Sequence, residues 1–173
     1  MAAISRSRRA TAGIAFLVAG VVIAVAAILP LLGVSVPWLF LIGYAALAMG
    51  LVILAIGAVN ATIAKIALFA GAVGWVILVL GGVGIVLPAV VTTTGAVLAA
   101  LGTLIGAIVL YAGREIVNRS AIAFVIAALL AALFLLGYLG VFSLGAFGTI
   151  VTIAFGVAFA VTGFLFRATE RKR

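Results

Sequence analysis

The sequence contains no cysteine and no histidine, and it has only two acidic residues, Glu115 and Glu170. It therefore offers no thiolate nucleophile, no imidazole base and no structural zinc site of the usual kind. Catalysis by paired carboxylates would require Glu170, in the C-terminal tail, to reach Glu115. We expect no enzyme activity, no catalytic residue, no metal site and no cofactor.

Charge of either sign is also scarce. Soluble domains are about 25% charged, whereas this chain of 173 residues is 7% charged and 69% hydrophobic. Such a composition cannot cover a water-exposed exterior, so the solvent must be lipid. The net charge of +8 does not indicate nucleic-acid binding, because the basic residues stand at the edges of apolar runs and form no basic domain.

The charges divide the chain into three apolar runs. Ala10 to Ala64 is uncharged for 55 residues, Ile66 to Gly113 for 48 and Ser120 to Phe166 for 47. One membrane crossing takes about 20 helical residues, so each run predicts two crossings joined by a short turn. The sequence thus predicts an all-α polytopic membrane protein in which six transmembrane helices form three hairpin repeats.

Glycine and proline place the turn near the middle of each run. The turn residues are Gly33 to Pro37, Gly84 to Gly95 with Pro88, and Gly140 to Gly145. The predicted helices are 10–32, 37–59, 63–87, 92–113, 120–139 and 145–166. They form one transmembrane domain, 1–173, with hairpins 10–59, 63–113 and 120–166 and short tails 1–9 and 167–173.

All ten Lys and Arg residues fall on one side of a six-helix arrangement. By the positive-inside rule both termini are expected in the cytoplasm, with the basic residues near anionic lipid headgroups. The start of the chain also has features of a cleaved signal peptide, but its apolar run is longer than the usual 7 to 15 residues. We expect the first helix to be retained.

Glycines recur seven residues apart within the predicted helices, which places each set on one helix face. Membrane helices associate through close contact at small residues. The stripes therefore predict packing within one protomer, with docking of a second copy or another membrane protein as the alternative. They are Gly13 and Gly20; Gly43, Gly50 and Gly57; Gly74 and Gly81; Gly95 and Gly102; and Gly156 and Gly163; in 120–139, alanines 123, 127, 128, 131 and 132 take their place.

The three-hairpin pattern resembles the HdeD-like family of bacterial inner-membrane proteins, also called acid-resistance membrane proteins. The residues that carry the resemblance are Gly20, Pro30, Gly43 and Gly50 in the first hairpin, Gly74, Gly81, Pro88, Gly95, Gly102 and Gly106 in the second, and Gly137, Gly140, Gly148, Gly156 and Gly163 in the third, which lacks the proline. The resemblance implies a bacterial cytoplasmic membrane protein of stress response, without an enzymatic site.

Few polar side chains are available for a site. Glu115 precedes Arg119 by four residues, which predicts a helix-end ion pair, and Lys65 lies near a helix start, where its side chain can reach the interface. Thr92, Thr93 and Thr94 are expected to cap a helix, with the lining of a small vestibule as the alternative.

The remaining candidates for a functional site are aromatic side chains and hydroxyl groups deeper in the predicted helices. Trp38 and Tyr138 are expected at the membrane boundary. Tyr44, Trp75 and Thr103 lie deeper, and each is expected to bond a neighbouring helix rather than face a ligand cavity.

Two functions remain open. The first is a non-enzymatic stress or acid-resistance protein that acts through the bilayer or a membrane partner. The second is a small substrate-binding or solute-permeation subunit of a transporter, and its substrate would be largely apolar or neutral. No ligand-binding residue is assigned by the sequence.

Overall fold

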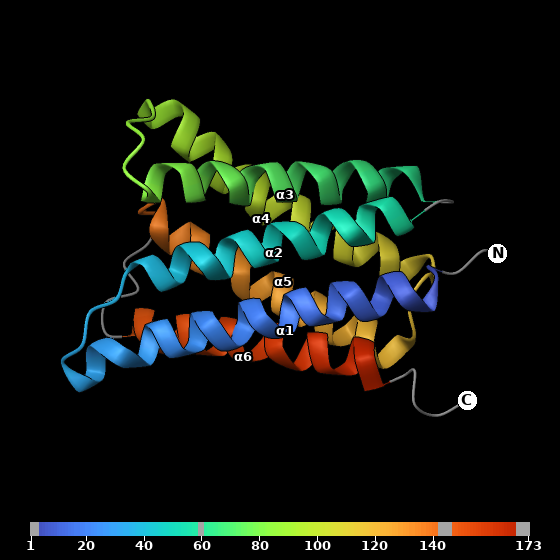
Figure 1. The fold of residues 1–173 in the computed structure, drawn as a ribbon. Helices are drawn as coiled ribbons and strands as arrows, with labels where there is room; N and C mark the ends of the chain where they lie inside the picture. Colours follow the sequence, from blue (N-terminus) through green and yellow to red (C-terminus); the bar gives the residue numbers. More distant parts are fainter. Residues whose placement is uncertain (1–3, 59–60, 142–146, 169–173) are drawn as a thin grey trace.

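The computed structural model describes residues 4–58, 61–141 and 147–168. Within these ranges the chain forms six helices that are long and apolar enough to cross a membrane. They are α1 (Arg6–Ile28, extended by the 3-10 turn η1, Leu29–Leu32), α2 (Trp38–Gly57), α3 (Thr62–Gly82), α4 (Ala89–Ala112), α5 (Asn118–Tyr138) and α6 (Phe147–Ala168) (Figure 1). The protein is an all-α polytopic membrane protein, as predicted.

Each hairpin turns at a glycine in the left-handed backbone region. Gly33, Gly84 and Gly140 have φ angles of 78°, 89° and 73°. In each case the residue after the glycine donates a backbone hydrogen bond to the carbonyl five residues earlier, as Val34 does to Leu29. This pairing satisfies carbonyls that the helix end leaves free. The three turns share one geometry, which confirms the predicted hairpin repeat.

Some helix boundaries differ from the prediction. α3 ends at Gly82 rather than at residue 87, because the chain turns at Gly84. α4 begins at Ala89, directly after Pro88, rather than at residue 92. Phe142, Ser143, Leu144 and Gly145 of the third predicted turn lie outside the described residues.

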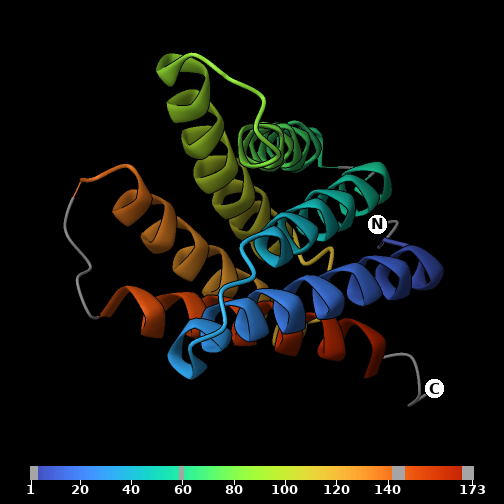
Figure 2. The same ribbon diagram turned by 60° about the vertical axis from the view of Figure 1, so that its left-hand side comes forward.

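The six helices form a closed ring in chain order (Figure 2). Each helix packs along its neighbours in sequence, and α6 closes the ring by packing along α1. Contact between α4 and α5 is the least extensive around the ring, and these helices diverge at one end in Figure 2.

Aromatic side chains fill one half of the ring's interior. Phe16 of α1 lies 5.4 Å from Phe124 of α5, 5.6 Å from Phe159 of α6 and 5.9 Å from Phe166, measured between ring centroids. All four rings are buried to less than 2% exposure. This aromatic cluster joins three neighbouring helices of the ring, α5, α6 and α1, and its tilted and edge-on contacts are the favoured geometry for aromatic side chains.

Two helix pairs approach through their backbones at glycine. A Cβ at Gly20 would collide with the backbone of Ala160, and one at Gly163 with the backbone of Leu17, so α1 and α6 touch along this stripe. In the same way a Cβ at Gly74 would collide with the backbone of Ala99, where α3 meets α4. Such close approach lets membrane helices gain van der Waals contact.

The glycines of α2 act differently, as sockets for side chains. A Cβ at Gly43 would meet Ile23 and one at Gly50 would meet Phe16, both from α1. On α5, Ala127 and Ala128 are fully buried. The prediction that small residues pack helices within one protomer is confirmed at these positions. Gly81 is the exception, because the nearest atom to a Cβ there is Leu87 Cδ1, 3.9 Å away.

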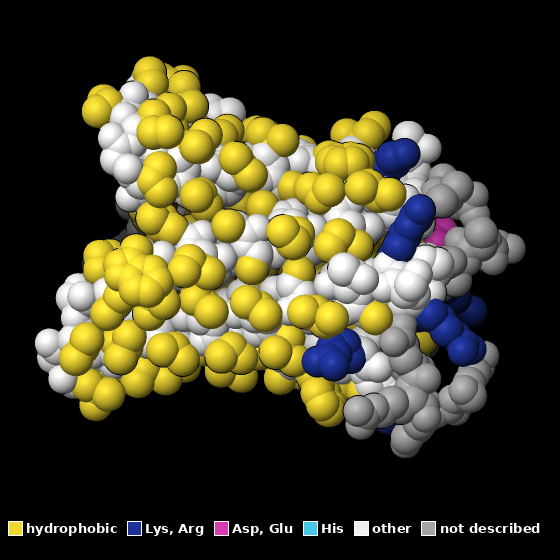
Figure 3. Space-filling model, in the orientation of Figure 1, with side chains coloured by type: hydrophobic (Ala, Val, Ile, Leu, Met, Phe, Trp, Pro, Cys, Tyr) yellow, Lys and Arg dark blue, Asp and Glu magenta, His cyan; other side chains and the backbone are white. Residues whose placement is uncertain are grey.

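The two ends of the bundle differ in charge. The described charged residues lie at the start of α1, the start of α3, the α4–α5 connection, the start of α5 and the end of α6, which share one end (Figure 3). We call it the charged end and the opposite one the uncharged end. At the charged end Arg8 Nη1 donates a hydrogen bond of 3.0 Å to the carbonyl of Ile56 near the end of α2. Glu170, Arg171, Lys172 and Arg173 lie outside the described residues.

Candidate functional site

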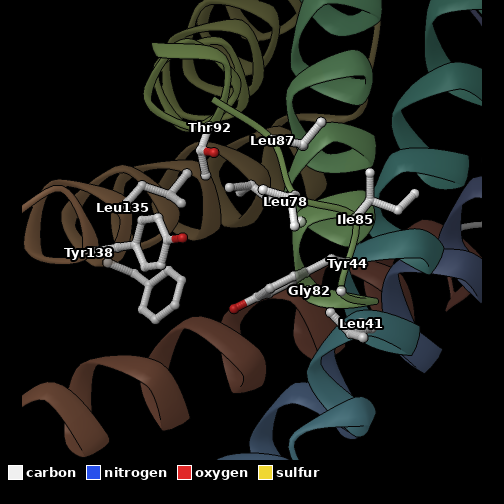
Figure 4. Close-up of a pocket in the computed structure, with 13 residues that line it drawn as sticks. Leu41, Tyr44, Leu78, Gly82, Ile85, Leu87, Thr92, Leu135 and Tyr138 are labelled. Carbon is white, nitrogen blue, oxygen red and sulfur yellow. The ribbon is translucent and has the colours of Figure 1, made fainter. Parts of the chain in front are cut away.

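A cavity of about 480 Å³ opens among α2, α3, α4 and α5 towards the uncharged end (Figure 4). Its volume falls within the range of about 300 to 1,000 Å³ typical of small-molecule sites. The lining residues are Leu41, Tyr44, Leu78, Gly81, Gly82, Gly84, Ile85, Val86, Leu87, Thr92, Phe134, Leu135 and Tyr138. We call it the outer cavity.

The α3–α4 connection forms one wall of the outer cavity. It contributes Gly84 to Leu87, and α3 ends early enough for this connection to reach the cavity. At Gly81, near the end of α3, a Cβ would meet only Leu87 Cδ1, 3.9 Å away, so the missing side chain leaves room in the cavity. Val86 of the connection, which also lines the cavity, is 96% exposed. The early end of α3 and its terminal glycines therefore create part of the hollow.

Among the described residues of the lining, three hydroxyl groups are the only polar side-chain groups, and none of these residues is charged. Tyr44 comes from α2, Tyr138 from α5 and Thr92 from the first turn of α4. Figure 4 shows the hydroxyls of Tyr44 and Tyr138 pointing into the same space from opposite sides. Neither has a hydrogen-bond partner among the residues that the structure describes. The site can therefore hold an apolar molecule and hydrogen-bond a polar group on it.

The floor of the outer cavity is fixed by aromatic rings that pack against one another, some tilted and some stacked. Tyr44 lies 5.0 Å from Trp75, and Phe134 lies 5.5 Å from Phe155, between ring centroids. Trp75 and Phe155 are themselves stacked at 5.9 Å, with 10° between their planes. The cavity thus rests on buried rings, which fixes the position of Tyr44.

One buried hydrogen-bond chain lies beneath this floor. Trp75 Nε1 donates to Thr103 Oγ1 at 3.2 Å, and the Thr103 hydroxyl donates to the carbonyl of Ala99 at 2.6 Å. Trp75 and Thr103 are both fully buried and belong to α3 and α4. The expectation that each bonds a neighbouring helix is confirmed for this pair.

For Tyr44 that expectation is wrong, because its hydroxyl faces the outer cavity instead of a neighbouring helix. The capping role expected of the threonines is also wrong. Pro88 is the N-cap of α4 without a side-chain cap bond, and the Thr92 hydroxyl donates back to the Pro88 carbonyl at 3.4 Å. Thr92 lines the cavity, as the vestibule alternative proposed, whereas Thr93 and Thr94 are exposed outside it.

The aromatic residues expected at the boundary are exposed there. Trp38 is 57% exposed at the first position of α2, and Tyr138 is 58% exposed at the last position of α5. Tyr138 also lines the outer cavity, so it lies at its mouth. Sequence reasoning assigned it only to the boundary.

Sequence reasoning missed the apolar lining, namely Leu41, Leu78, Phe134 and Leu135. No signal in the sequence marks these residues, because leucine and phenylalanine are suited equally to lipid, to the bundle interior and to a cavity wall. Glycine was a usable signal, since Gly81, Gly82 and Gly84 cluster where the cavity opens.

The charged end does not contain the predicted ion pair. Glu115 lies in the connection before α5 and is 7% exposed, whereas Arg119 is exposed, and no salt bridge joins these two described residues. The pairing rule requires both residues on one helix. Arg9 Nε, Glu115 Oε2 and Ser120 Oγ are buried and have no hydrogen-bond partner in the part of the chain that the structure describes. Lys65 is exposed.

A second, shallow groove lies on the lipid-facing side of the bundle, between α1 and α6, and is bordered by Gly20 and Ala160. All its lining side chains are apolar, among them the exposed Val21, Val25 and Phe164. A groove on the lipid-facing side without a polar group fits acyl chains of the bilayer and does not select a ligand.

Comparison with protein-family models, with curated proteins and with solved structures gave no match. The resemblance to HdeD-like proteins therefore stays a prediction.

Proposed function

We propose that this membrane protein binds a small, uncharged and largely apolar molecule in the outer cavity, as a non-enzymatic capture protein or the substrate-binding subunit of a transporter. The observation that carries the proposal is the cavity itself. It is of small-molecule size, has apolar walls and a few converging hydroxyl groups, and contains no charge. These properties characterise ligand sites in proteins.

The interior supports capture rather than passage. The aromatic cluster of Phe16, Phe124, Phe159 and Phe166 fills the ring between the outer cavity and the charged end. A pore for a neutral solute would require an open path through this region. A protein that takes up a molecule at one end and retains it fits the described interior better.

The distribution of charge supports a specific orientation. With both termini in the cytoplasm of a bacterium, the charged end would meet the anionic inner leaflet. The outer cavity would then open at the external side of the cytoplasmic membrane. A molecule would reach it from outside the cell or from the outer leaflet.

The HdeD-like resemblance adds a physiological hypothesis. A protein that captures an apolar molecule at the outer leaflet could contribute to survival under acid or membrane stress, alone, as a homo-oligomer or with a membrane partner. Deletion of the gene is expected to reduce survival under such stress. Unchanged survival would remove the stress hypothesis and leave the binding proposal in place.

The binding proposal is tested by filling the cavity. Gly81→Leu adds a side chain where the nearest atom to a new Cβ is 3.9 Å away, so the helix can stay in place while the cavity shrinks. The control is Ala112→Leu, which introduces a side chain of the same size at an exposed position. Ala112 is the last residue of α4, at the charged end and away from the cavity. The probe is the uncharged dye prodan, whose emission shifts to the blue in an apolar site.

In identical detergent micelles the wild type and Ala112→Leu are expected to give the same saturable blue shift, whereas Gly81→Leu gives only the micelle background. Equal dye binding by all three proteins would contradict the proposed function. Circular dichroism of each variant confirms that the helices are intact.

A further inference from the structure

The position of the two tyrosines in the outer cavity points to the chemistry of its ligand, given the proposed function. Tyr44 is half-buried on α2 and Tyr138 is at the mouth on α5. Their hydroxyls face one another across the cavity (Figure 4). Two opposed hydroxyls can hold a single polar group between them, each as donor or acceptor.

Both hydroxyls lack a partner among the described residues. A hydroxyl in apolar surroundings is costly unless it is hydrogen-bonded. Three other interior hydroxyls satisfy this requirement within their own helices, since Thr103, Thr152 and Thr162 donate to the carbonyls of Ala99, Gly148 and Ala158, whereas Ser120 at the charged end does not. Within the outer cavity, Tyr44 and Tyr138 are the hydroxyls left to hydrogen-bond a bound molecule or water.

The rest of the lining restricts the ligand further. Apart from the three hydroxyl-bearing residues, the walls are formed by apolar side chains and glycines, and Leu78, Leu135 and Phe134 are among them. No lining residue carries a charge that could neutralise a phosphate, a carboxylate or an amine. A charged group in this site would remain unpaired, and that is far more costly than a neutral polar group.

We propose that the outer cavity binds an uncharged amphiphile whose hydroxyl or carbonyl head is held between Tyr44 and Tyr138 and whose hydrocarbon chain lies against the leucine walls. The two tyrosines select the head, and the absence of charge excludes ionised lipids. The chain leaves the cavity where α4 and α5 diverge, the least tightly packed part of the ring.

Three probes separate the contribution of the head from that of the chain. Farnesol, farnesene and farnesyl phosphate share one isoprenoid chain and end in a hydroxyl, in hydrocarbon and in a charged group. Binding is followed through Trp75, which is fully buried and lies 5.0 Å from the ring of Tyr44. The protein has two tryptophans. Replacing the other one, by Trp38→Phe at an exposed position outside the cavity, leaves Trp75 as the single fluorescent reporter.

Farnesol is expected to bind more tightly than farnesene, and farnesyl phosphate is expected to bind least. Tyr44→Phe keeps the ring and removes one hydrogen bond, so farnesol affinity is expected to fall about fivefold while farnesene affinity stays unchanged. Tyr44→Phe with Tyr138→Phe is expected to make the two ligands equal. Tyr111→Phe, outside the cavity lining on α4, is the matched control and is expected to leave all affinities unchanged.

The outcomes separate this inference from the proposed function. Equal affinity for farnesol and farnesene in the wild type, or tightest binding of farnesyl phosphate, overturns the inference alone, provided that Gly81→Leu still abolishes binding. If no probe binds, or if Gly81→Leu leaves binding unchanged, the proposed function fails as well.

Discussion

At the scale of single residues, glycines of similar spacing have opposite roles. Gly20 lets the backbones of α1 and α6 touch, so any side chain there would collide with Ala160. Gly81 instead leaves space that belongs to the outer cavity. The spacing of glycines in the sequence identified both as members of a stripe, but only the position of the neighbouring helix distinguishes contact from space.

This difference gives a direct prediction for stability. Gly20→Ala is expected to destabilise the protein by about 1 to 3 kcal/mol, the usual cost of overpacking, because neither backbone can move without separating α1 from α6. Gly81→Ala is expected to cost nothing measurable. Unfolding of both variants in mixed micelles by a denaturing detergent tests this, and equal stability of the two would contradict the assigned contacts.

The bond between Trp75 and Thr103 gives a second prediction. Trp75→Phe and Thr103→Ala each remove the 3.2 Å hydrogen bond that joins α3 to α4. Hydrogen bonds between membrane helices contribute on average about 0.6 kcal/mol, and a double-mutant cycle isolates that value from the changes in packing. A coupling energy of this size is expected, and strictly additive effects of the two substitutions would show that the bond does not form.

The residue roles that sequence reasoning missed share a cause. Glu115 and Arg119 have the spacing of a helical ion pair, but α5 begins only at Asn118, so the spacing rule does not apply. Tyr44 has the features of a residue that bonds a neighbouring helix, but it lines a cavity that the α3–α4 connection also lines, because α3 ends at Gly82 rather than at residue 87. In both cases a helix boundary, uncertain by a few residues in any sequence-based prediction, decides the role of a side chain.

At the scale of helices, more of the structure could be predicted from the sequence than at the scale of single side chains. The charged residues and the mid-run glycines located all six helices and the turn glycine of each hairpin, because a membrane requires long apolar segments and allows turns only at their ends. The end of α3 was placed five residues too late because Ile85, Val86 and Leu87 are as apolar as a helix interior. Apolar composition does not distinguish a connection that lines a cavity from a further helical turn.

The turn glycines give a prediction at this scale. Gly33 has a φ angle of 78°, and a Cβ there would meet nothing within 4 Å. The cost of Gly33→Ala is therefore a backbone cost alone, about 1 to 2 kcal/mol. Gly33→Asn is expected to cost less, because asparagine tolerates this region. Thermal unfolding of both variants provides the test, and an alanine variant as stable as the wild type would contradict the turn geometry.

At the scale of the whole molecule, sequence composition was sufficient to place the protein in a membrane but not to arrange its helices. The order of helices in the ring depends on which face of each helix points inward. On α5, the inward Ala127 and the outward Leu129, 52% exposed, are both apolar, because lipid and protein interior favour the same residue types. The packing of α6 against α1, which closes the ring, could therefore be learned only from the structure. The same is true of the outer cavity among α2, α3, α4 and α5.

The orientation in the membrane is a prediction at this scale. The chain has no cysteine, so single cysteines can be labelled without background. Ser35→Cys lies in the exposed α1–α2 connection at the uncharged end, and Arg119→Cys is exposed at the charged end. In intact cells a membrane-impermeant maleimide is expected to label only Ser35→Cys. Labelling of Arg119→Cys alone would place the charged end outside.

The most direct test of the central claim is to locate a small apolar molecule bound to the protein. Crystals grown in a lipid mesophase and soaked with 1-bromonaphthalene would show the bromine by its anomalous scattering. We predict a bromine position between Tyr44 and Tyr138 in the wild type and none there in Gly81→Leu. Bromine found only on the lipid-facing surface, with the outer cavity empty in the wild type, would contradict the assignment of this cavity as the binding site.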